Sequence, residues 1–152
     1  MFGLNARPVI SPLPRILLAE DNEVNQKVAL RMLDRIGYPA DLAVNGVEVL
    51  NALAHTSYDI ILMDLHMPLM GGLETATAIR SRPDLPQPII VALTASATTA
   101  DRDRCLKAGM DDYLCKPIEM DRLRDTIWMH TPSFAHATPR PSARLSSPRA
   151  QK

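Results

Sequence analysis

The sequence of 152 residues predicts an α/β protein built on a doubly wound parallel sheet. Five short apolar runs alternate with five segments of helical periodicity, which is typical of a parallel sheet covered on both faces. The run Ile60–Met63 is apolar throughout and too short for a helix, as expected of a strand buried on both sides. Right-handed crossovers leave few topologies, and we expect the flavodoxin-like (βα)5 strand order 2-1-3-4-5.

The first predicted strand, Arg15–Ala19, leads into an amphipathic helix over Asn22–Ile36. Asn25 points into the middle of the apolar arc of this helix, which consists of Val28, Ala29, Met32, Leu33 and Ile36. The pattern therefore predicts a buried hydrogen-bond partner for Asn25. It also predicts that Leu30, on the opposite and polar side, is exposed.

The later elements follow from the same two periodicities. Strands are predicted at Asp41–Val44, Ile60–Met63, Ile89–Thr94 and Asp112–Cys115, and helices after Asn45-Gly46, from Gly71-Gly72 to Arg80, over Ala97–Ala108, and around Met120, Leu123 and Ile127. The helix predicted over Ala97–Ala108 has only a thin apolar stripe. Little burial would hold this helix in place, so it is a candidate for movement.

The two ends of the chain lack this alternation. Residues 1–14 contain three prolines and no periodic pattern, and we interpret them as a linker or leader. Residues 131–152 are interpreted as a disordered, basic tail rich in proline and serine. The folded domain is therefore expected over residues 15–130.

The formal net charge of zero conceals an acidic domain. Five of the 17 basic residues lie in the terminal segments, which leaves twelve basic against 17 acidic residues in the predicted domain, a net charge of −5. Direct nucleic-acid binding needs a basic surface, so we expect none. The chain has no apolar run of about 18 residues that could span a membrane and no secretory signal. Its two scattered cysteines fit a reduced, cytoplasmic setting.

Polar side chains stand where four of the predicted strands end: Glu20 and Asp21, Asp64, Thr94, and Lys116. The carboxyl ends of parallel strands meet at one edge of the sheet, so we expect these groups to lie together. Three neighbouring carboxylates repel one another and need positive charge. Lys116 supplies one charge, and Mg²⁺, which prefers carboxylate, water and phosphate oxygens, is the expected supplement.

Such a site suits phosphoryl transfer. Asp64 would act as the nucleophile, since a carboxylate can form an aspartyl phosphate. The metal and Lys116 would stabilise the charge on the moving phosphoryl group. Thr94 could donate a hydrogen bond to an oxygen of the new phosphate.

Four motifs at these positions resemble those of receiver domains of two-component signalling. They are Ile16-Leu17-Leu18-Ala19-Glu20-Asp21-Asn22, Asp64-Leu65-His66-Met67-Pro68, Ala92-Leu93-Thr94-Ala95 and Tyr113-Leu114-Cys115-Lys116-Pro117. The resemblance covers about Arg15 to His130, which is nearly all of the predicted domain. It implies a phosphoacceptor that switches conformation and loses its phosphate slowly, and not an enzyme with turnover.

The resemblance also implies the metal and phosphate ligands. Asp64 is expected to be the phosphate acceptor. Glu20 and Asp21 are expected to hold Mg²⁺ together with Asp64 and the backbone carbonyl of His66. Lys116 is expected to pair with the phosphate.

Other positions match the family's switch and its control of phosphate lifetime. Thr94 and Tyr113 correspond to the switch pair, in which the threonine moves to the phosphate and the aromatic ring turns inward. His66 and Ser96 lie two residues past the acceptor and the switch threonine, and are expected to modulate the lifetime of the phosphate. The Lys116-Pro117 peptide is expected to be cis.

Two positions depart from the family pattern. Gly71 occupies a place where the family usually has an aspartate, which removes a cap and a charge but no essential ligand. Cys115 stands where a small residue, often serine, is usual.

The expected partner is a histidine kinase or a phosphotransfer protein, and a second copy of the chain is a further candidate. The stretch from Glu20 to Gln26 is similar to receivers fused to hybrid sensor histidine kinases. A stand-alone single-domain response regulator is an alternative. A second alternative is a metal-dependent phosphatase with an aspartyl-phosphate intermediate, although such enzymes commonly have an aspartate at the place of His66. A third is a binding module that is never phosphorylated.

Overall fold

The computed structural model describes residues 13–96 and 98–134. These residues form one five-stranded parallel sheet in the order β2-β1-β3-β4-β5. The elements are β1 (Ile16–Ala19), α1 (Glu23–Ile36), β2 (Ala40–Ala43), α2 (Gly46–His55), β3 (Ile60–Asp64), α3 (Gly72–Arg80), β4 (Ile89–Thr94), α4 (Thr99–Lys107), β5 (Asp112–Cys115) and α5 (Met120–His130). The predicted fold class and strand order are confirmed, and the element bounds agree within a few residues.

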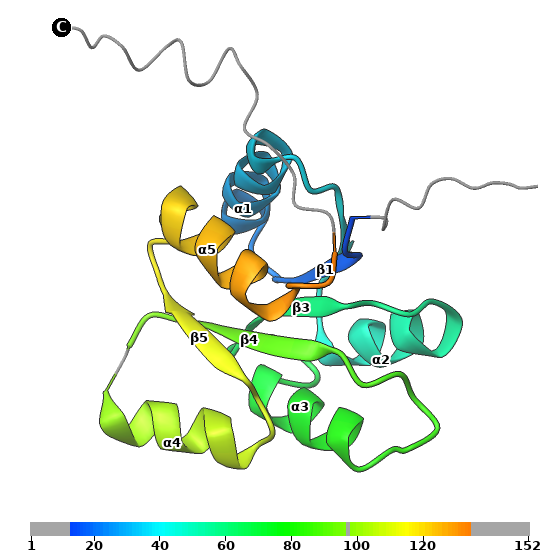
Figure 1. Cartoon of the computed structure of the whole chain (residues 1–152). Coiled ribbons are helices and arrows are strands. Elements are labelled where there is room, and N and C mark those ends of the chain that lie inside the picture. The colour runs from blue at the N-terminus through cyan, green and yellow to red at the C-terminus, as the bar shows by residue number, and fades with distance from the viewer. Residues whose placement is uncertain (1–12, 97, 135–152) are drawn as a thin grey trace, which may run out of the picture.

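The helices form two layers on opposite faces of the sheet (Figure 1). Helices α1 and α5 cover one face, and α2, α3 and α4 cover the other. This arrangement follows from the β–α–β crossovers, because β1 lies between β2 and β3 and the chain reverses direction across the sheet there.

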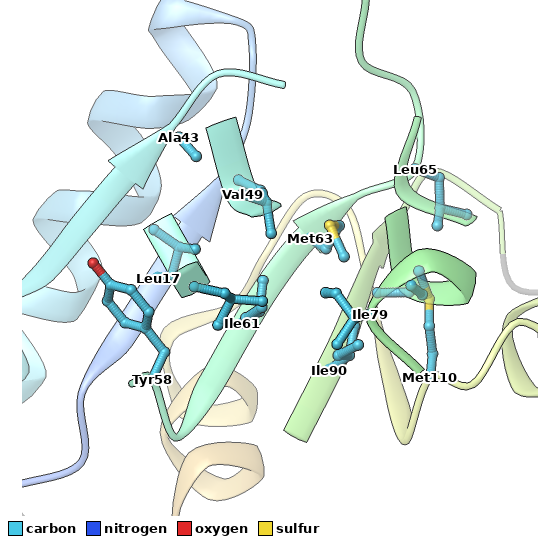
Figure 2. Close-up of a cluster of buried hydrophobic side chains, with 14 of the residues drawn as sticks. Leu17, Ala43, Val49, Tyr58, Ile61, Met63, Leu65, Ile79, Ile90 and Met110 are labelled. Atoms are coloured by element: carbon cyan, nitrogen blue, oxygen red, sulfur yellow. The ribbon is translucent and has the colours of Figure 1, made fainter. Parts of the chain in front are cut away.

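The core consists of two apolar clusters separated by the sheet. Strand β3 is buried along its whole length and contributes to both. Ile60 and Leu62 face the layer of α1 and α5, while Ile61 and Met63 face the other layer. Figure 2 shows the cluster on the side of α2, α3 and α4, in which Ile61 and Met63 lie near Ile79 of α3. The alternation explains why this strand is apolar at every position.

The prediction for the buried side of α1 was right in part. Ala29, Leu33 and Ile36 of the predicted arc are buried. Three positions differ, because Asn25 is exposed, Val28 is 46% exposed and Leu30 is half-buried against the core. The apolar arc of the sequence is wider than the surface that α5 and the sheet cover, and periodicity alone does not indicate which part of a wide arc is covered.

Helix α4 is held by little burial, as its sequence indicated. Cys105 is the only residue of Thr99–Lys107 that is buried, and Leu106 is 60% exposed. Ala97, where the helix was predicted to begin, lies outside the described residues. The movement expected of this helix stays a prediction.

The folded part extends slightly beyond the predicted domain limits. Pro14 and Thr131 are both buried, and the Thr131 hydroxyl donates a hydrogen bond of 2.6 Å to the carbonyl of Ile127. The rest of the predicted leader and tail, residues 1–12 and 135–152, lies outside the described part of the chain. Among the described residues, no helix is both long and apolar enough to cross a membrane.

Candidate functional site

The polar groups that follow four strands meet at one edge of the sheet. Asp64 and Thr94 are the last residues of β3 and β4, and Glu20 and Lys116 directly follow β1 and β5. The parallel register pairs Ala19 with Met63, so each of these groups leaves the sheet at nearly the same level. The predicted meeting of the strand ends is therefore present in the structure.

Three carboxylates form a compact cluster at this edge. One oxygen from each of Glu20, Asp21 and Asp64 can be chosen so that all lie within 4.8 Å of one another. Glu20 is 2% exposed and Asp64 is 6% exposed, whereas Asp21 is open to solvent. Hard oxygen donors at this spacing could hold a divalent cation, and the exposed Asp21 gives an ion access to the two buried carboxylates.

Lys116 bridges the two buried carboxylates. Its Nζ lies 3.0 Å from Oε1 of Glu20 and 3.2 Å from Oδ1 of Asp64. Burial opposes the charge of the ammonium group, but the hydrogen bond to Glu20 and the negative charges of Asp64 and Glu20 prevail and raise the pKa of Lys116. One lysine cannot neutralise three carboxylates, so a cluster with this composition fits an added cation. The Lys116-Pro117 peptide is cis, as expected.

Backbone and side-chain donors from the start of α1 hold Glu20 in place. The amide of Asn22 donates to Oε2 of Glu20 over 3.2 Å, and the side-chain amide of Gln26 donates to its carbonyl over 2.7 Å. Gln26 was not among the site residues predicted from the sequence. Its position one turn into a helix that follows two carboxylates is the signal that points to such a contact.

Gly72 lets the loop after β3 pack directly against the backbone of Asp64. A Cβ atom at this position would lie 2.4 Å from the carbonyl oxygen of Asp64 and 2.9 Å from Cα of Leu65. The amide of Gly72 donates to the carbonyl of Leu65 over 2.9 Å, which closes the loop. The pair Gly71-Gly72 was predicted only as a helix start, and this close approach was not predicted.

Thr94 is buried, and its hydroxyl is engaged within its own loop. Its Oγ1 donates to the carbonyl of Ser96 over 2.8 Å and accepts from the amide of Ser96 over 3.1 Å. In this arrangement the hydroxyl ties the end of β4 to the segment that leads into α4.

Tyr113 lies on β5, on the same side of the sheet as Thr94. The register pairs Ala92 with Tyr113, and Thr94 is two residues beyond Ala92 on β4. Because residues i and i+2 of a strand share a face, both members of the predicted switch pair belong to the face covered by α4. The ring of Tyr113 is half-buried and lies beneath the guanidinium group of Arg102, whose Cζ is 4.9 Å from the ring centroid.

His66 lies at the rim of the site with an exposed side chain. Its backbone amide is 3.4 Å from Oδ1 of Asp64, a long contact that helps to orient the carboxylate. Across the rim, Asp101 near the start of α4 accepts hydrogen bonds from Ser96 and Thr98, and these bonds lower its pKa. Burial of Asp101 opposes this lowering of its pKa, and the charge of Arg104 adds to it.

Comparison with known proteins gives a consistent family match. The sequence model of the response regulator receiver domain matches residues 16–128. The hybrid signal transduction protein dokA of Dictyostelium discoideum is 39% identical over 130 residues, which cover 84% of this chain and 8% of dokA. Histidine protein kinase 1 of Candida albicans is 42% identical over 135 residues, covering 82% of this chain and 6% of that kinase. The chain thus spans only a small part of these relatives.

Two solved structures are similar in both sequence and fold. The receiver domain of a sensor histidine kinase from Pseudomonas aeruginosa, solved with magnesium in its active-site cleft, is 38% identical with a TM-score of 0.71, covering 77% of this chain and 96% of that one. A receiver domain from Saccharomyces cerevisiae, crystallised with a histidine phosphotransfer protein, is 33% identical with a TM-score of 0.70, covering 78% of this chain and 89% of that one.

Proposed function

The chain belongs to the response regulator receiver domain family, and we propose that it accepts a phosphoryl group from a phosphohistidine onto Asp64. The observation that carries this proposal is the position of Asp64. Its carboxylate is buried at the end of β3, 3.2 Å from the ammonium group of Lys116 and beside Glu20 and Asp21. A nucleophile needs such a fixed position beside groups that stabilise the charge of the transferred group.

In the proposed reaction a carboxylate oxygen of Asp64 forms a bond to phosphorus while the phosphorus–nitrogen bond of the donor histidine breaks. The leaving imidazole takes a proton from solvent. Lys116 stays charged throughout, because its pKa is raised, and stabilises the anionic phosphoryl oxygens. In this proposal the hydroxyl of Thr94, which follows the register partner of Asp64 on β4, exchanges its bond with Ser96 for one to a phosphoryl oxygen.

Mg²⁺ is the proposed cofactor, held by Glu20, Asp21 and Asp64 with the backbone carbonyl of His66. When bound, it would supply the positive charge that offsets the repulsion between three carboxylates and the incoming phosphoryl group. The hard oxygen donors and the spacing of the cluster support this assignment. In this proposal His66 and Ser96 flank the path of the water that later hydrolyses the aspartyl phosphate, and so set its lifetime.

The surface beside the site supports a helical phosphotransfer partner. A cleft of about 260 Å³ opens at Glu20 and Lys116 and is otherwise lined mainly by apolar side chains, among them Val28 and Ile118. We place the helix of the donor over this cleft, because Lys116 in its lining contacts Asp64 over 3.2 Å. The adjoining surface of α1 exposes Val24 together with three basic residues, Lys27, Arg31 and Arg35. An apolar patch with a basic rim fits a partner helix with apolar and acidic side chains.

We further propose that this receiver works within a hybrid sensor histidine kinase, as a cytoplasmic domain. The similarity to dokA and to the Candida albicans kinase supports this context. A stand-alone response regulator is the alternative, and it would use the same acceptor chemistry.

The deciding experiment is intact-mass spectrometry of the chain after incubation with acetyl phosphate. We expect one added phosphoryl group that requires Mg²⁺ and is absent from Asp64→Asn. Asp84→Asn is the matched control, because Asp84 is an exposed carboxylate that pairs with Arg82 outside the site. Labelling of the Asp64→Asn variant to the wild-type level would refute the assignment. Steady turnover of p-nitrophenyl phosphate would instead favour a phosphatase.

A further inference from the structure

The ring of Tyr113 is held between the sheet and a cation of helix α4. One side of this residue packs against the core cluster beneath α4, and the guanidinium group of Arg102 lies over the ring at 4.9 Å. Among the described residues Arg102 has no salt-bridge partner, in contrast to Arg104 two positions later, which pairs with Asp101 over 3.1 Å. The ring of Tyr113 is therefore the contact that places the head group of Arg102.

Arg102 lies a short distance along the chain from Thr94, and hydrogen bonds hold both the end of β4 and the start of α4. The hydroxyl of Thr94 makes two hydrogen bonds to Ser96. Thr98 then caps α4 by accepting from the amide of Asp101, and Arg102 is the next residue. A movement of the Thr94 hydroxyl would break its two hydrogen bonds to Ser96. Because α4 has only one buried side chain, little packing opposes a displacement of this helix that would lift Arg102 from the ring.

We propose that Arg102 is a positioning residue that holds Tyr113 in the resting conformation and so opposes the phosphorylation switch. The stack coexists with the Thr94–Ser96 bonds, which are the bonds that a phosphoryl group on Asp64 would draw away. This inference rests on the proposed function, because it assumes that a group on Asp64 competes for Thr94. It assigns a role to a residue outside the motifs identified from sequence.

The expected effect follows from linkage between two conformations. A phosphoryl mimic that prefers the switched conformation binds more tightly when the resting conformation loses stability. Loss of the stabilisation that an exposed cation–π contact gives the resting conformation corresponds to a change in affinity of roughly two- to five-fold. Arg102→Ala should therefore bind Mg²⁺–beryllofluoride about two- to five-fold more tightly than the wild type.

The experiment uses the full chain labelled with 3-fluorotyrosine and followed by fluorine NMR during titration with beryllofluoride in Mg²⁺. The chain has three tyrosines, so the resonance of Tyr113 can be assigned with Tyr113→Phe. We expect the resonance in free Arg102→Ala to be displaced toward its position in the saturated wild type. Arg102→Lys, which keeps the charge but loses the planar group, should bind with an affinity between the two.

The affinity for beryllofluoride, and not the position of the resonance, tests the role of Arg102. Loss of a neighbouring charge can by itself displace the resonance of Tyr113. With Mg²⁺ held at a saturating concentration, the titrated ligand is the beryllofluoride anion. Loss of a cation near an anion weakens binding by simple electrostatics, so tighter binding of beryllofluoride cannot come from charge. Arg104→Ala removes the same charge from the same helix and should leave the wild-type affinity or weaken it.

Two failures can be told apart. If the wild type responds to beryllofluoride and Arg102→Ala binds with equal or lower affinity, the role of Arg102 is refuted and the proposed function stands. If the wild type responds no more than Asp64→Asn, the proposed function fails and the role of Arg102 falls with it.

Discussion

Lys116 Nζ lies 3.0 Å from Oε1 of Glu20, although 96 residues separate the two in the chain. The same ammonium group lies 3.2 Å from Oδ1 of Asp64, so one cation serves two buried carboxylates. With Asp21 beside them, the negative charges outnumber the positive one. The site is therefore arranged to attract cationic groups, and its stability should depend on them.

Replacement of Lys116 should expose this dependence. We expect Lys116→Ala to lower the free energy of unfolding by roughly 1–3 kcal/mol, because Glu20 and Asp64 then remain buried without their cation. We also expect a larger rise in melting temperature with Mg²⁺ than in the wild type, because the ion replaces lost positive charge. Thermal unfolding by circular dichroism with and without Mg²⁺ tests both. An unchanged melting temperature in the absence of the ion would contradict the first expectation.

Asp21 should matter for metal binding and not for folding. It is exposed, so Asp21→Asn removes repulsion and should leave the stability of the metal-free protein equal or slightly higher. The apparent affinity for Mg²⁺ should fall by about tenfold or more, because one of three anionic ligands is lost. Melting temperature as a function of Mg²⁺ concentration gives this affinity. Asp103→Asn, on the exposed side of α4, is the control and should bind Mg²⁺ like the wild type.

The two adjacent glycines after the acceptor loop should respond differently to substitution. Gly72→Ala places a Cβ 2.4 Å from the carbonyl oxygen of Asp64, whereas the nearest atom for Gly71→Ala is the carbonyl oxygen of Leu65 at 3.1 Å. We expect Gly72→Ala to cost about 1–3 kcal/mol of stability and to reduce labelling by acetyl phosphate, because the backbone of Asp64 must shift. Gly71→Ala should cost clearly less. Denaturant unfolding and intact mass measure the two effects, and equal costs would argue against the close approach.

Tyr58 should make stability fall at alkaline pH. Burial, followed by the hydrogen bond to Asp41 and the charge of Asp41, raises the pKa of Tyr58 to about 12. Between the ordinary tyrosine pKa of 10.0 and about 12, the folded state keeps a proton that the unfolded state loses. The free energy of unfolding should therefore decrease as pH rises through this window. Urea unfolding at several pH values tests this, and Tyr58→Phe should show a smaller decrease.

The local elements and the polar groups that stand at the strand ends could be predicted from the order of residues. The apolar run before Asp64 is buried on both faces, and the polar residues at strand ends share one edge, because alternation and parallel strand direction follow from backbone geometry. The thin apolar stripe of α4 likewise corresponds to a helix with one buried side chain. These features depend on spacing within short segments.

Other features depended on the assembled fold. The placement of α1 against α5 and the sheet decides which part of its apolar arc is covered. Asn25 lies outside the covered part, and Leu30 is half-buried. The distance from Lys116 to Glu20 and the stack of Arg102 on Tyr113 arise from strand register and helix placement. Sequence alone determined which chemical groups stand at the strand ends, because each strand's pattern is local. Tertiary structure decided which of them touch, because contacts between distant segments depend on the packing of the whole chain.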